Sequence, residues 1–188
     1  MYVLIAGLAL FLIPHSARIV APQWCGRMHT RLGENGWKGL YSLVSLVGLV
    51  LIVWGYGLSR LDPVILYSPP VWMRHITLVL MMPVFVMLAA AYIPGRIKST
   101  LKHPMLAAVK LWALVHLLAN GDLASMLLFA AFLAFAVVDV ISAKKRATAP
   151  VRPRVNPMLD VLTVIIGLVA YMGLMHAHGH LFGVPVIA

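Results

Sequence analysis

The segment YVLIAGLALFLIPHSARIV, residues 2–20, is apolar almost throughout and carries one histidine, His15, near its end. A helix of about 20 predominantly apolar residues is long enough to cross the hydrocarbon core of a bilayer. No basic region precedes this segment, and no small-residue cleavage motif follows it. We therefore expect it to stay in the protein as a first transmembrane helix rather than to act as a removable signal peptide.

The rest of the chain has the same apolar character. It has 188 residues, of which 62% are hydrophobic and only 11% are charged. A soluble domain of this length cannot bury so much apolar surface, so lipid must solvate much of it. The sequence predicts an all-α, polytopic integral membrane bundle of about six transmembrane helices, and residues 1–188 form a single domain. The five further helices are expected at about 38–58, 72–93, 104–119, 123–142 and 159–176.

The charged residues are distributed unequally between the two sides of this bundle. The chain has fifteen Lys and Arg residues and only five Asp and Glu residues. Of the basic residues, four lie in the connection after the first helix, three in that after the third and five in that after the fifth. The opposite side holds only Arg60 and Arg74. The positive-inside rule therefore places both termini in the periplasm of a bacterial inner membrane. Topology and anionic lipid explain the excess charge, so we expect the bilayer, and no nucleic acid, as its partner.

Two features of the first half of the chain bear on helix packing. Residues 18–38 form a basic connection whose turn formers argue against a continuous helix, and these are Pro22, Gly26, Gly33 and Gly36. The next helix carries small residues on one face, which favours close helix approach in a membrane. These small residues are Ser45, Gly48 and Gly55.

Two histidines, His15 and His116, lie inside the apolar segments. An ionisable side chain at membrane depth is costly, so it is by default a candidate functional group. Arg18 and Lys110 serve as depth markers, because long basic side chains near helix ends reach the interface. They place the two imidazoles roughly 5 and 9 Å from the same interface, at a rise of about 1.5 Å per residue. The sequence thus predicts a joint site in the cytoplasmic half of the membrane.

The residue types around this pair favour some ligands over others. Imidazole binds zinc, copper, iron and nickel, but a discrete zinc site needs three or four ligands, and no acid or cysteine is near. A haem needs one or two axial ligands and an apolar pocket. Arginines can pair with its propionates, and the candidates are Arg18, Arg27 and Arg31. An interhelical hydrogen bond without any cofactor and a proton relay are the alternatives that remain open.

Other polar residues are expected to have supporting or structural roles. Trp112, His116 and Asn120 form one helical stripe, in which Asn120 can hydrogen-bond the far nitrogen of His116. His103 and Asp122 are interpreted as helix caps. His178 and His180 are interpreted as a solvated tail, with a local metal or lipid contact as the alternative, and the role of their cluster with His176 stays open. The sequence contains no nucleotide-binding glycine motif and no nucleophile arrangement, so it does not decide whether the chain is an enzyme.

Several short motifs resemble those of the NnrU family, which is similar to 15-cis-zeta-carotene isomerase. These motifs are FLIPHSAR from residue 11, KHPM from 102, LWALVHLLANGD from 111 and the H-x-x-L-F-G pattern from 178. The isomerase family binds haem b and exchanges an axial ligand with redox state, and NnrU proteins are associated with denitrification and nitric oxide metabolism. The K-H-P turn at Lys102 and His103 also resembles membrane methyltransferases of the isoprenylcysteine type.

The resemblance implies specific roles for residues of this chain. His15 and His116 match the two haem-ligating histidines, which makes them the expected iron ligands of a haem b. Ala113 stands where the isomerase has the cysteine of ligand exchange. The expected function is a redox, nitric oxide-linked or isomerase-like role, and an enzyme of this kind would be a haem-dependent isomerase or oxidoreductase. The alternative is a non-catalytic membrane factor that assists assembly or traffic of a respiratory complex, with structural histidines. Its possible partners are respiratory or denitrification membrane proteins.

Overall fold

The computed structural model describes residues 1–146 and 156–186, and these parts of the chain are almost entirely helical. They contain no strand, apart from one isolated bridge between Ile65 and Asp122. Five of the helices are long and apolar enough to cross a membrane, and α5 is a shorter apolar helix of 16 residues. The predicted all-α membrane bundle of about six spanning helices is thereby confirmed. The helices are α1 (Tyr2–Val20), α2 (Pro22–Ser59), α3 (Trp72–Tyr92), α4 (Arg96–Leu101), α5 (Pro104–Ala119), α6 (Leu123–Arg146) and α7 (Pro157–Phe182).

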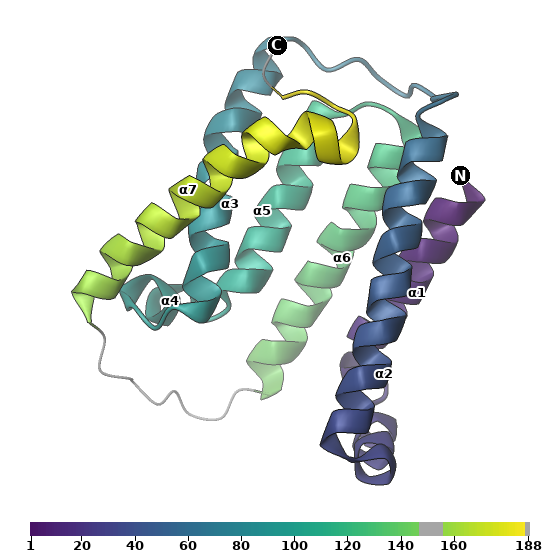
Figure 1. The fold of residues 1–188 in the computed structure, drawn as a ribbon, viewed down its shortest axis with the longest axis vertical. Coiled ribbons are helices and arrows are strands. Elements are labelled where there is room, and N and C mark those ends of the chain that lie inside the picture. The colour runs from purple at the N-terminus through teal and green to yellow at the C-terminus, as the bar shows by residue number, and fades with distance from the viewer. Residues whose placement is uncertain (147–155, 187–188) are drawn as a thin grey trace.

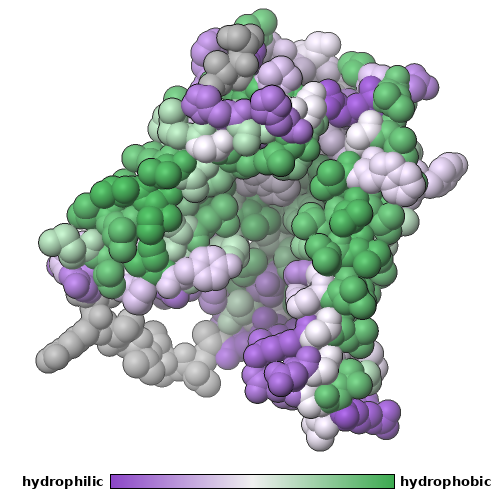
Figure 2. Space-filling view, in the orientation of Figure 1, coloured by the Kyte–Doolittle hydropathy of each residue, from purple (hydrophilic) through white to green (hydrophobic). Residues whose placement is uncertain are grey.

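The long helices form an open series rather than a closed bundle. In the order α2, α1, α6, α5, α3 and α7, each helix packs against the next. The two end members, α2 and α7, meet where Arg60 bonds the end of α7. Away from this contact, Figure 2 shows the surface hollowed between them. Helices α5 and α6 form the floor of this opening, as Figure 1 shows.

The two ends of the bundle differ as the charge pattern predicts. The start of α1 and the end of α7 lie at the same end of the molecule, whereas the end of α6 and the start of α2 lie at the other (Figure 1). Lys144, Lys145 and Arg146 close α6 at that second end, which we call the basic end. Two other basic residues of the same connection, Arg152 and Arg154, lie outside the described residues.

The predicted small-residue face of α2 is where α1 packs against it. A Cβ atom on Gly55 would lie 2.3 Å from the backbone nitrogen of Leu4, and one on Gly48 would lie 2.7 Å from that of Phe11. On the α1 side, Gly7 makes an equally close approach to α2. Only glycine fits at such backbone-to-backbone contacts, so these residues set the distance between the two helices.

Two expectations about local structure are wrong. The basic connection after α1 is helical from Pro22 onward, because proline is tolerated in the first turn of a helix. Only Gly33, with φ 70° and ψ 170°, interrupts it. The histidine-rich segment after residue 176 is also helical, because α7 continues to Phe182 and ends at the left-handed Gly183.

Candidate functional site

His116 lies on α5 within one turn of the end of the helix. Its Nδ1 atom is 2.8 Å from the carbonyl oxygen of Trp112. A carbonyl oxygen only accepts hydrogen bonds, so Nδ1 carries the proton and a neutral imidazole keeps a free lone pair on Nε2. The ring packs between aromatic neighbours, with ring centroids 4.6 Å from Phe129 and 5.4 Å from Trp112. The side chain is therefore held rigidly, and one nitrogen remains available to a ligand.

Asn120 supports this residue in a different way from the one predicted. Its Nδ2 atom donates to the backbone carbonyl oxygen of His116 at 2.8 Å, and not to the far ring nitrogen. Asn120 ends the helix at an extended backbone position, so its amide reaches back to the last turn. The interaction stabilises the end of α5 and leaves the imidazole unchanged.

His15 on α1 repeats the arrangement of His116. Its Nδ1 atom is 2.6 Å from the carbonyl oxygen of Phe11, which again leaves Nε2 free. The ring stacks on Phe11 at 4.3 Å between centroids and lies 5.0 Å from the ring of Tyr41. His15 is therefore chemically equivalent to His116, but its surroundings differ.

The structure does not bring His15 and His116 into one cavity. The rings of Phe11, Phe132 and Trp112 lie between them, with centroid separations of 5.6 Å from Phe11 to Phe132 and 5.4 Å from Phe132 to Trp112. A row of aromatic side chains from three helices thus links the two histidines, which line different cavities.

The predicted match in depth also fails. His15 lies beside Phe135 of α6, whereas His116 lies beside Phe129, six residues nearer the opposite end of the bundle. That offset corresponds to roughly 9 Å along a helix. Lys110 does not mark the interface, because α5 begins at Pro104 and Lys110 lies near the middle of this helix.

His116 lines two adjoining cavities of about 340 and 300 Å³, which we call the His116 chamber. The first cavity lies among α3, α5 and α7, and the second lies among α2, α5, α6 and α7. Both are mostly apolar, and no Asp, Glu or Cys lines either of them. The residues common to both cavities are Met81, His116, Asn120, Leu174, His178 and Val184.

His178 is the chamber residue that the sequence interpretation missed. It is partly buried on α7, and its Nδ1 atom is 2.7 Å from the carbonyl oxygen of Val184 in the turn that follows the helix. Its neighbours His176 and His180 are exposed. The usable signal was Gly183 as a helix stop, because a longer helix places His178 on the same face as Tyr171 and Leu174.

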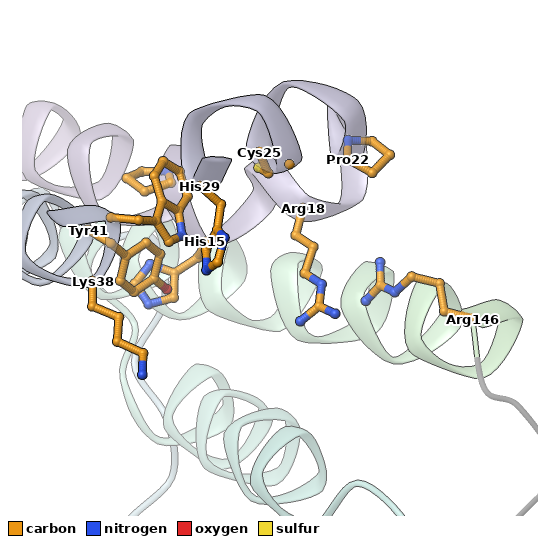
Figure 3. A pocket seen from close by; sticks show the side chains of 11 residues that line it. His15, Arg18, Pro22, Cys25, His29, Lys38, Tyr41 and Arg146 are labelled. Carbon is orange, nitrogen blue, oxygen red and sulfur yellow. The ribbon is translucent and has the colours of Figure 1, made fainter. Parts of the chain in front are cut away.

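His15 lines a separate cavity of about 730 Å³ at the basic end, which we call the basic pocket. Figure 3 shows Arg18 and Arg146 directed into the same space. Arg146 pairs with Asp139 at 3.4 Å, and Lys38 pairs with Glu34 at 2.5 Å. The predicted partners Arg27 and Arg31 are exposed and are not among its lining residues. The pocket favours an anionic group, but it lies away from His116.

Of the two predicted helix caps, Asp122 forms capping hydrogen bonds and His103 does not. Asp122 caps α6, because its carboxylate accepts from the backbone nitrogen of Ser125 at 2.9 Å and from its hydroxyl at 2.6 Å. His103 occupies the N-cap position of α5, but its side chain makes no capping hydrogen bond. Within residues 1–146 and 156–186, no three His, Cys, Asp or Glu side chains cluster as a metal site would require.

Comparison with known proteins gives the family. The family described as NnrU protein matches residues 3–186, which is nearly the whole chain. Searches of curated proteins and of solved structures found no match to this chain. Because the family match extends over all seven helices and includes both His15 and His116, the chain belongs to the NnrU family.

Proposed function

We propose that this chain is a multi-pass protein of the bacterial inner membrane, with both termini periplasmic, that binds one haem b through His116. The haem would serve redox, nitric oxide- or denitrification-linked, or isomerase-like chemistry. The observation that carries the proposal is the free Nε2 atom of a rigidly held imidazole in an apolar, aromatic chamber. A neutral histidine of this kind is a common axial ligand of haem iron.

The chamber fits haem better than it fits a bare metal ion. No carboxylate or thiolate lines it, so the charge of an isolated divalent cation would be buried without compensation. A porphyrin is dianionic and brings its own four nitrogen ligands, so the protein has to supply only axial imidazoles and apolar surface. The two adjoining cavities also fall within the range of roughly 300–1,000 Å³ that is usual for bound organic ligands.

The chain's own residues would bind, orient and shield the group. His116 would bind the iron, and the carbonyl oxygen of Trp112 fixes the orientation of its ring. Phe129, Phe132 and Leu128 present apolar surface that excludes water. Bound haem supplies an iron that can change its redox state and its axial ligands. Ligand exchange with a thiolate at position 113 is not available, because Ala113 has no thiol and the sole cysteine, Cys25, lines the basic pocket.

Absorption spectroscopy tests the proposal directly. The wild-type protein is purified in detergent from haem-supplied cells alongside His116→Ala and the control His75→Ala, which removes an exposed histidine at the start of α3. We expect a Soret band that shifts on dithionite reduction in the wild type and the control, and its weakening or loss in His116→Ala. Well-folded wild-type protein without haem would contradict the proposal and favour the assembly or traffic factor with structural histidines.

A further inference from the structure

Two histidines from different helices present the same chemistry to the His116 chamber. His116 donates its Nδ1 proton to Trp112, and His178 donates its Nδ1 proton to Val184. Each neutral ring therefore has an Nε2 lone pair and no second proton. Both residues line both cavities of the chamber. The chamber thus contains two nitrogen Lewis bases, which suit one electron-poor centre between them.

The helices that carry the two rings leave room for such a centre. Helices α5 and α7 each pack against α3, and they do not form an extensive contact with each other. His116 and His178 accordingly reach the chamber from different walls. Side chains from different helices can hold one cofactor between them, as in the cofactor and metal sites of helix bundles.

The position of His178 is set by the turn that ends α7. Gly183 adopts a left-handed conformation, with φ 68° and ψ 14°, and reverses the chain so that the Val184 carbonyl oxygen meets the imidazole. Arg60 holds the same turn by donating to the carbonyl oxygens of Phe182 at 2.9 Å and Gly183 at 3.2 Å. Such hydrogen bonds to the second ring nitrogen orient ligating histidines in metalloproteins.

We infer that His178, rather than His15, supplies the second axial ligand opposite His116. The inference rests on the proposed haem binding and adds to it the identity of the ligand pair. It assigns His15 to the basic pocket, on the far side of the ring row of Phe11, Phe132 and Trp112.

Spin state distinguishes the ligand pairs without any measurement of activity. Ferric haem is examined by absorption and electron paramagnetic resonance in wild type, His178→Ala, His15→Ala and His176→Ala. His176 lies on the same helix two residues earlier and is exposed, so its removal is the matched control. We expect a low-spin, six-coordinate signal in wild type, His15→Ala and His176→Ala. In His178→Ala we expect conversion to a high-spin signal, and added imidazole should restore the low-spin form.

A second variant guards against a folding defect in His178→Ala. In His178→Met the thioether can replace imidazole as ligand, so we expect a low-spin haem with a raised reduction potential. Two results together would overturn the inference and leave haem binding by His116 intact. They are a haem that stays low-spin in His178→Ala and a haem whose reduction potential in His178→Met equals that of the wild type. Loss of the low-spin signal in His15→Ala instead would also overturn it. Wild-type protein with no Soret band would overturn both the inference and the proposed function.

Discussion

At the scale of single residues, backbone carbonyls decide what the histidines can do. His15 and His116 each donate to the carbonyl oxygen four residues earlier, which a helix always supplies. His178 donates instead to Val184, six residues later, and so depends on the turn after α7. The first two rings are oriented by their own helices, whereas the third is oriented by tertiary structure.

The polar chain beside the chamber gives a prediction at this scale. The hydroxyl of Tyr56 lies 2.9 Å from that of Ser125, which in turn donates to Asp122 at 2.6 Å. Tyr56→Phe removes one partner while Ser125 keeps the other, so we expect a loss of about 1 kcal/mol in stability. Thermal unfolding in detergent measures it, and Tyr2→Phe at a highly exposed tyrosine is the control. Equal effects of the two substitutions would contradict the role of the Tyr56–Ser125 bond.

At the scale of helices, close backbone contact holds α1 against α2. Gly55→Val would place a branched side chain against the backbone of Leu4, 2.3 Å from where the new Cβ would lie. Such overpacking costs roughly 1–3 kcal/mol or more, and we expect a clearly lowered midpoint of thermal unfolding. Gly57→Val is the matched control, because no atom lies within 4 Å of a Cβ at that position. If both variants unfold at the same temperature, helix approach at Gly55 does not limit stability.

The end of α7 gives a second prediction about an element. Gly183→Ala forces a residue with a Cβ atom into the left-handed region, at a cost of about 1–2 kcal/mol. It also crowds Arg60, whose Nη1 would lie 3.1 Å from the new Cβ. We expect lower stability and a weaker low-spin haem signal. Gly173→Ala, in open space within α7, should preserve both. An unchanged spectrum in Gly183→Ala would show that the turn does not position His178.

The helices could be predicted from the sequence and much of the site could not. Long apolar runs and Gly or Pro signals located the helices because lipid requires every span to satisfy its own backbone. The similar depth of His15 and His116 failed because Lys110, taken as a marker of the interface, lies near the middle of α5, although the bounds of this helix were predicted correctly. The aromatic row between them requires Phe132 of α6 to lie between α1 and α5, which is a property of packing alone.

At the scale of the whole molecule, the unequal number of basic residues at the two ends of the bundle predicts a fixed orientation in the membrane. The basic end holds Arg18, Lys38 and the cluster at the end of α6, and the opposite end holds Arg60 and Arg74. Loops rich in lysine and arginine stay in the cytoplasm during insertion. The chamber, which lies near the termini, would then face the periplasmic half of the bilayer, and the basic pocket the cytoplasmic half.

Cysteine accessibility tests this orientation. In a Cys25→Ser background, Asp62→Cys places a thiol at the exposed loop after α2, and Lys145→Cys places one at the exposed end of α6. A membrane-impermeant maleimide should label position 62 in cells with a permeabilised outer membrane and position 145 only after the inner membrane is opened. Both sites are exposed, so a difference in labelling reports the side of the membrane. Labelling of position 145 alone in intact inner membranes would reverse the topology and put the His116 chamber in the cytoplasmic half.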